Sequence, residues 1–171
     1  MIFEIHITGD KSIHEICKQI NIKTINVCLL APNQSAIRCE DMTSFVFNGT
    51  EADCYRKVLE VAGVLQNCGV PIYRMKIESP IVPELIHKSL YVETHFKTEN
   101  IEEPDHDFRF SPKFTLPTSR NTSKDYYLAT DREYRQDKYD EFINKYKGKE
   151  LELCILDTNI EEDSDWFDCY S

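Results

Sequence analysis

One alternation of polar and apolar residues occurs at the start of the chain and again beyond its middle. Phe3–Thr8 reads FEIHIT, and Tyr91–Lys97 reads YVETHFK. Because successive side chains of a β-strand point to opposite faces, each stretch places a Glu-x-His sequence and a third polar residue on one face. The other face is largely apolar and can pack into a core. The repeat predicts two half-buried strands that carry similar polar rows.

The order of the predicted elements repeats as well. A strand, a helix and a strand are expected at 44–47, 51–67 and 72–77, and again at 126–129, 133–146 and 151–156. With 171 residues and 41% hydrophobic content, the chain can form one domain with a shared core. We therefore predict an α+β fold of two pseudo-symmetric β/α lobes, in a ferredoxin-like or related arrangement around a central groove. The expected lobes are 1–88 and 89–157, followed by an acidic tail, 158–171.

The most regular segment of the sequence is the expected helix at 51–67. Thr50 can cap its first turn, and Gly69 follows its end. An apolar stripe with helical spacing is formed by Cys54, Val58, Val61, Ala62 and Leu65. A shorter helix is expected at 13–20 and a strand at 24–30, whereas 34–43 and the proline-containing stretch 99–123 are expected to be irregular.

Composition excludes several classes of protein. A net charge of −10 disfavours extended, sequence-independent binding to DNA or RNA, because neutralising phosphates needs a basic surface. No apolar run is long enough to span a membrane, and the acidic start does not resemble a signal peptide, so a cytoplasmic protein without a membrane partner is expected. The seven cysteines are odd in number and form no CxxC pair, which favours reduced thiols over disulfides or a zinc ribbon.

The repeated histidines are the candidate catalytic residues. If the two strands border one groove, His6 and His95 can act as general acid and general base towards a phosphoester. Five cationic or hydroxyl-bearing side chains, one of them in an expected loop, are candidates for holding phosphate oxygens. These substrate-binding candidates are Thr8, Lys97, Arg74, Lys76 and Arg120. Glu4 and Glu93 precede the histidines by two residues and are expected to orient them.

His6-Ile7-Thr8 resembles the His-x-Thr/Ser motif of the two-histidine (2H) phosphoesterase superfamily. That resemblance implies two lobes around a groove, hydrolysis of a cyclic nucleotide or an RNA-end phosphoester, and no metal or other cofactor. The second copy, His95-Phe96-Lys97, has lysine where the family has a hydroxyl. A literal match, His87-Lys88-Ser89, lies in an expected connector and lacks the flanking pattern.

Two other functions are consistent with the same residues. Glu4, His6, Glu93 and His95 form a chemically competent ligand set for zinc, manganese or iron, although the ammonium of Lys97 would repel a cation. Alternatively, the groove holds a nucleotide or peptide without turnover. A single strand histidine is most often an ordinary hydrogen-bonded residue, and only the repetition favours a shared site.

Overall fold

The structure is a computed structural model that describes residues 1–30, 37–79, 89–98, 108–114, 124–130, 140 and 147–158. These residues form a nine-stranded antiparallel sheet and two helices, which confirms the α+β class. The strands are β1 (Ile2–Gly9), β2 (Thr24–Leu30), β3 (Ile37–Thr43), β4 (Phe45–Asn48), β5 (Ile72–Ser79), β6 (Tyr91–Thr98), β7 (Phe108–Phe114), β8 (Lys124–Thr130) and β9 (Lys147–Asp157). The helices are α1 (Ile13–Gln19) and α2 (Glu51–Asn67).

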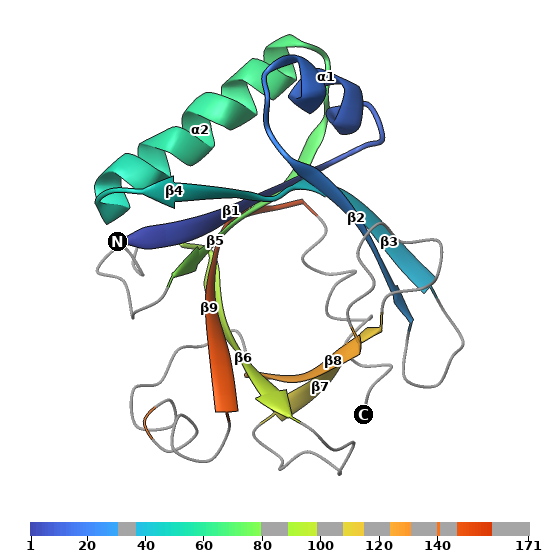
Figure 1. Ribbon diagram of the computed structural model, residues 1–171, viewed down its shortest axis with the longest axis vertical. Helices are drawn as coiled ribbons and strands as arrows, with labels where there is room; N and C mark the ends of the chain where they lie inside the picture. Colours follow the sequence, from blue (N-terminus) through green and yellow to red (C-terminus); the bar gives the residue numbers. More distant parts are fainter. Residues whose placement is uncertain are drawn as a thin grey trace.

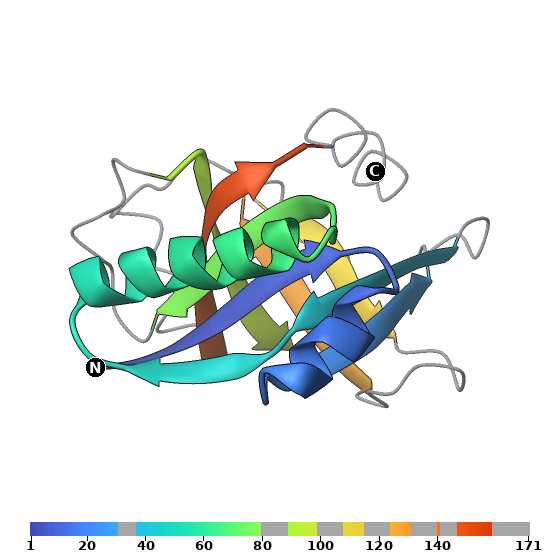
Figure 2. The same ribbon diagram turned by 90° about the horizontal axis from the view of Figure 1, so that it is seen from above.

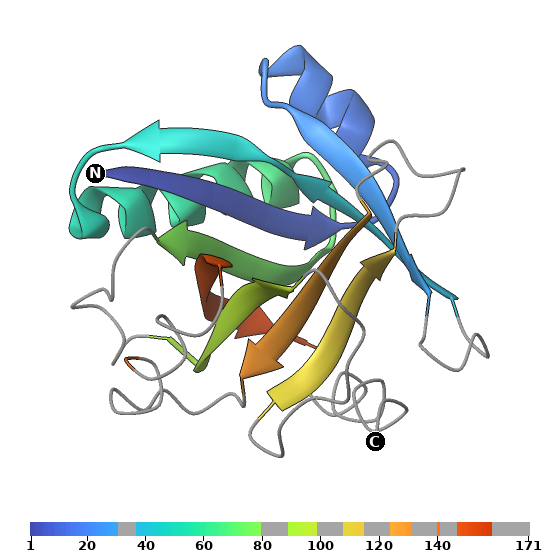
Figure 3. The same ribbon diagram turned by 60° about the horizontal axis from the view of Figure 1, so that its bottom comes forward.

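The sheet curls on itself until its two ends approach each other. The strand order is β2-β3-β1-β5-β9-β6-β8-β7, and β2 and β7, at the two ends of this order, are in contact. Figures 1 and 3 show the strands arranged as an almost closed ring. We call the side of the sheet that faces the centre of this ring the inner face, and the opposite side the outer face.

Both helices cover the outer face of β1 and its neighbours (Figures 1 and 2). Phe3, Ile5 and Ile7 of β1 are almost completely buried in the cluster that includes the apolar sides of the helices. The buried residues of α2 are Cys54, Val58, Val61, Ala62 and Leu65, so the predicted stripe is confirmed. The predicted cap is confirmed too, because Oγ1 of Thr50 accepts a hydrogen bond of 3.1 Å from the backbone N–H of Asp53. The apolar core therefore lies between the helices and the outer face.

Because the apolar residues of β1 face the helices, its polar residues face the ring centre. Glu4, His6 and Thr8 share the inner face, as predicted, and pair with Glu78, Lys76 and Arg74 of β5. A β-bulge at Tyr73 shifts the register, since Thr8 pairs with Arg74 but Gly9 pairs with Ile72. Ile72 consequently joins the core, although uninterrupted alternation along β5 would place it on the same face as Arg74.

Two strands lie where the sequence predicted irregular structure. β3 occupies most of the stretch 34–43, and β7 lies within 99–123. β3 has polar residues on both of its faces, so its sequence shows no clear alternation. Pro112 interrupts the alternation of β7. A proline is tolerated there because β7 is the last strand in the order and, among the described strands, pairs in the ladder only with β8.

Strands from the two halves of the chain belong to one sheet. β9 lies between β5 and β6, so the second half pairs directly with the first. The predicted duplication stays a prediction, because all of the expected helix 133–146 except residue 140, the connector with His87 and the tail beyond Thr158 lie outside the described residues. Within the described part of the chain, neither helix has the length and apolarity needed to cross a membrane.

Candidate functional site

Four glutamates lie side by side across the inner face. Glu4 of β1 pairs with Glu78 of β5, Glu78 pairs with Glu152 of β9, and Glu152 pairs with Glu93 of β6. We call these residues the glutamate row. Residues paired in this way have Cβ atoms about 5 Å apart, and like charges directly opposite each other destabilise a sheet. Glu93 and Glu152 are also buried, so the row requires positive charge close by.

Part of that charge comes from Lys76, which lies two residues before Glu78 on the same face of β5. Its ammonium donates a hydrogen bond of 2.7 Å to Oε2 of Glu152. Burial alone would lower the pKa of Lys76, but the charges and hydrogen bond of Glu152, with help from Glu78, raise the pKa above its ordinary value. Lys76 is therefore a charged ammonium that neutralises the middle of the glutamate row.

His6 lies beside Glu4 and Glu78, at one end of the glutamate row. Its Nδ1 lies 3.0 Å from the carbonyl oxygen of Thr43. Since a carbonyl can only accept, Nδ1 carries a proton and donates it. The opposite nitrogen, Nε2, lies 3.0 Å from Oε1 of Glu78 and 3.7 Å from Oε1 of Glu4. The side chain of His6 is 8% exposed, so these contacts are made largely out of water.

A break between β3 and β4 holds this arrangement in place. The backbone N–H of Ile7 donates to Oγ1 of Thr43 at 2.9 Å, and that hydroxyl donates to the carbonyl of Ile5 at 3.3 Å. The side chain of Thr43 thus bonds to β1 while its carbonyl accepts from His6. The hydroxyl of Ser44, the next residue, donates to Oε1 of Glu4 at 2.7 Å. The break therefore orients both His6 and Glu4.

The resulting cluster has the composition of a metal site. One donor atom from each of Glu4, His6 and Glu78 lies within 4.8 Å of the others. An imidazole nitrogen and two carboxylates suit zinc, manganese or iron. Metal-bound histidines usually donate their second ring N–H to a carbonyl or carboxylate, as His6 does to Thr43. The three side chains therefore form a candidate metal centre.

The structure separates the predicted four-residue metal set. Glu4 and His6 lie together, but Glu93 is at the other end of the glutamate row, three strand spacings or about 14 Å along the sheet. Position 95 lies two residues further along β6 and pairs with Glu150, and position 97 pairs with Lys147. The side chains of His95 and Lys97, and the whole of Arg120, lie outside the described part. Glu78 occupies the place that the sequence assigned to Glu93.

A pocket lies at the end of β1, and Thr8, two residues beyond His6, is part of its lining. Its volume is about 380 Å³. It is lined by Thr8, Gly9, Asp10, Lys11, Cys39, Glu40, Asp41, Tyr73, Arg74 and Asp157. Oγ1 of Thr8 is buried and has no hydrogen-bond partner among the described residues. Arg74 forms an ion pair with Glu40. Two predicted substrate-binding residues, Thr8 and Arg74, thus meet in one pocket.

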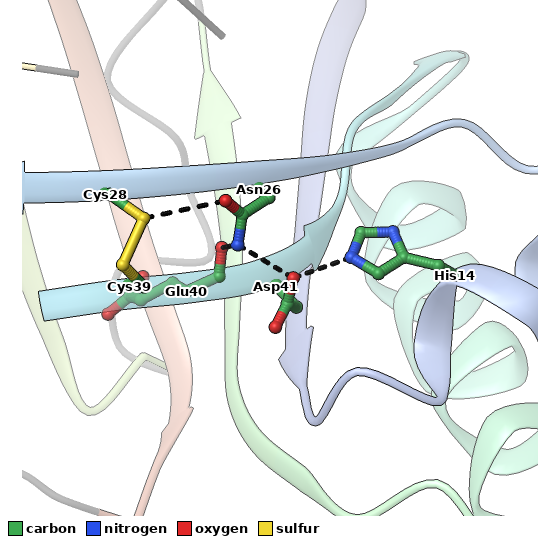
Figure 4. The surroundings of a disulfide bond; sticks show 6 residues. All are labelled: His14, Asn26, Cys28, Cys39, Glu40 and Asp41. Carbon is green, nitrogen blue, oxygen red and sulfur yellow. Dashed lines mark hydrogen bonds and ion pairs between the residues drawn. A yellow bond between two sulfur atoms is a disulfide. The ribbon is translucent and has the colours of Figure 1, made fainter. Parts of the chain in front are cut away.

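A histidine on α1 ties the helix to the wall of the pocket. Nε2 of His14 lies 2.6 Å from Oδ1 of Asp41, and its Nδ1 lies 2.6 Å from Oγ1 of Thr24. Asn26 donates a second hydrogen bond to Asp41 at 2.9 Å, as Figure 4 shows. Burial raises the pKa of Asp41, but the hydrogen bonds from His14 and Asn26 and the charges of His14 and Lys11 outweigh it and lower the pKa. We interpret this network as structural.

Comparison of the chain with protein-family models, with curated proteins and with solved structures finds no match. Function must therefore be argued from the site itself.

Several residues of the site were not identified from the sequence as functional. They are Glu40, Glu78, Glu152 and Asp157. The sequence contains a signal for two of them. The alternation of β5 places Glu78 on the same face as Arg74 and Lys76, and Glu152 lies within the alternating polar and apolar residues of β9. Glu40 was missed because its strand was not predicted.

The Asp41 network generates a prediction about pH. Since the folded pKa of Asp41 is below its ordinary value of 3.8, its carboxylate stabilises the fold above about pH 4, and this contribution is lost as the pH falls through the folded pKa. We expect Asp41→Asn to lower the free energy of unfolding by about 1 kcal/mol at pH 7 and by less at pH 3. Urea unfolding at both pH values measures the difference.

Glu15→Gln, on the exposed side of α1, is the control for this comparison and should change stability by no more than about 0.5 kcal/mol at either pH. An equal loss for Asp41→Asn at pH 7 and pH 3 would contradict the role assigned to the carboxylate.

Proposed function

We propose that the protein binds a divalent cation on its inner face through Glu4, His6 and Glu78. The observation that carries the proposal is the orientation of His6. Its Nδ1 proton is donated to Thr43, and its Nε2 points at two carboxylate oxygens. In a neutral imidazole that nitrogen has a lone pair, which repels an anionic oxygen 3.0 Å away unless a cation lies between them. A divalent ion binds all three groups and removes the repulsion.

The charge of the surrounding face supports the same conclusion. Among the inner-face residues of β1, β3, β5, β6 and β9 whose side chains the structure describes, six are carboxylates and two are permanently charged cations. The carboxylates are Glu4, Glu40, Glu78, Glu93, Glu152 and Asp157, and the cations are Arg74 and Lys76. Such a surplus of carboxylates attracts a cation far more strongly than a free anion. The competing arrangement is a protonated His6 that forms a purely structural ion pair with Glu78, and metal uptake distinguishes the two.

Titration of chelator-treated protein with Mn²⁺ and Zn²⁺ by calorimetry tests the proposal. We expect one site per chain, and we expect the isosteric change Glu78→Gln, like His6→Ala, to weaken binding at least about tenfold. Glu93→Gln serves as the comparison, because Glu93 belongs to the glutamate row but not to the cluster.

Three outcomes of the titration are informative. Weaker binding in Glu78→Gln with unchanged binding in Glu93→Gln supports the cluster described above. The opposite pattern supports the ligand set that includes Glu93 and His95. Folded wild-type protein that binds neither ion would identify His6 as the structural ion pair and end the proposal.

A phosphate-bearing small ligand, such as a cyclic nucleotide or an RNA end, is the second candidate. The hydroxyl of Thr8 favours it, because Thr8 is 7% exposed, its Oγ1 has no partner among the described residues, and it lines the pocket with Arg74 and Lys11. A buried hydroxyl without a partner costs about 1–3 kcal/mol, which a phosphate oxygen would recover. Because carboxylates predominate on this face, we propose that the phosphate binds together with the divalent ion.

Under this proposal the ion supplies positive charge that polarises a phosphoryl oxygen. His6 would then serve as a ligand rather than as an acid or base. This differs from the metal-independent mechanism of the 2H phosphoesterases, in which two histidines exchange protons with the substrate. In this chain His6 and His95 would have that role. Dependence on metal therefore separates the two mechanisms.

Incubation with 2′,3′-cyclic AMP in Mn²⁺ or in EDTA, followed by calorimetry and chromatography, tests the second candidate. We expect binding only with Mn²⁺, and binding about tenfold weaker in Thr8→Val, since one hydrogen bond to a charged group is worth about 1.5 kcal/mol or more. The unfolding midpoint of Thr8→Val checks that the variant is folded. Hydrolysis that persists in EDTA and is lost in both His6→Ala and His95→Ala would instead support the two-histidine mechanism.

A further inference from the structure

A disulfide joins β2 to β3, the strand that lines one side of the pocket. Cys28 of β2 and Cys39 of β3 are bonded, although the sequence favoured reduced thiols. The prediction failed because 34–43 was expected to be irregular, so the pairing of β2 with β3 was not foreseen. In the sheet, Cys28 is the register partner of Cys39. The two sulfurs therefore meet without any rearrangement of the strands.

The two cysteines of the disulfide differ in exposure. Cys28 is 3% exposed, whereas Cys39 is exposed and lines the pocket. Exposed disulfides are the ones that undergo exchange, because an attacking thiolate must reach a sulfur along the bond axis. A reductant can reach this bond through Cys39, and Cys28 is then the leaving group.

Three of the four other described cysteines have little tendency to compete for such chemistry. Cys17, Cys54 and Cys154 are buried free thiols, and burial raises the pKa of each to about 11. At neutral pH they are protonated and weakly nucleophilic. Cys68 is free and exposed at the end of α2, away from the lining of the pocket. Thiol exchange within the described part of the chain is thus confined to the disulfide and to Cys68.

The disulfide lies next to residues that shape the pocket. Glu40 and Asp41 follow Cys39 directly, and Glu40 pairs with Arg74. Sγ of Cys28 lies 3.6 Å from Oδ1 of Asn26, and the amide of Asn26 donates to Asp41. Figure 4 shows this chain of contacts from the sulfurs to His14. Any loosening of β2 against β3 therefore affects the pocket wall.

We propose that Cys28–Cys39 is a thiol–disulfide exchange site, opened by a dithiol reductant through Cys39, and that its state sets the rigidity of the pocket wall formed by β3. A thiolate of the dithiol attacks Sγ of Cys39, the bond between the two sulfurs breaks, and Cys28 leaves as a thiolate that takes up a proton. The second thiol of the reductant then attacks the mixed disulfide. The reductant ends as a disulfide, and Cys39 ends as a thiol. Two electrons and two protons have moved to the protein, and a disulfide oxidant of the same class reverses the reaction.

A redox titration of the folded protein tests the exchange. The protein is equilibrated with mixtures of reduced and oxidised dithiothreitol, alkylated without denaturant, and mapped by mass spectrometry in a Cys68→Ser background. We expect labels at Cys28 and Cys39 to appear together with a single midpoint, and no label at Cys17, Cys54 or Cys154. Labelling of Cys28 and Cys39 before any reductant is added, or only together with the three buried cysteines, would overturn the proposal.

Hydrogen exchange tests the effect on the pocket. Oxidised protein, reduced protein and the double variant Cys28→Ser with Cys39→Ser are compared by peptide-resolved exchange. Reduction and the double substitution should both cause a loss of protection in β3, while α2, which bears no part of the disulfide, keeps its protection. Equal protection of β3 in all three preparations would contradict the link between the disulfide and the pocket wall.

Discussion

Repulsion among register-paired glutamates is the constraint to which the rest of this structure responds. Glu4, Glu78, Glu152 and Glu93 lie on one line across four adjacent strands, and two of them are almost fully buried. A sheet does not tolerate such a line unless positive charge is placed against it. Lys76 meets this need for Glu152, and His6 is held against Glu78 and Glu4. The divalent-ion proposal follows from the same requirement.

The architecture explains how so polar a surface can exist inside a stable domain. The helices cover the outer face, so the apolar residues of β1 and β5 have a complete core on that side. The inner face does not need to supply this core and can therefore be polar. The break at Ser44 then orients two members of the cluster by backbone and hydroxyl contacts. The candidate site on the inner face is thereby separated from the apolar core on the outer face.

Much of the fold was predictable where local periodicity was strong. The stripe of α2, the cap at Thr50 and the two faces of β1 all follow from spacing within one segment. The strand β3, the bulge at Tyr73 and the disulfide do not, because each depends on a pairing partner elsewhere in the chain. The site shows the same division. His6, Glu4 and Thr8 were found from one strand, whereas the choice of Glu78 over Glu93 as a neighbour depends on strand order, which local periodicity does not encode.

The state of the His6 ring is the most direct test of the central claim. Nitrogen-15 NMR of the imidazole, recorded on metal-free protein and after one equivalent of Zn²⁺, reports the protonation of each ring nitrogen and any bond to a metal. The account predicts a protonated Nδ1 in both samples and a shift of the Nε2 resonance to that of a metal-bound nitrogen when zinc is added. An Nε2 resonance that stays that of a protonated imidazolium, unchanged by zinc, would contradict it.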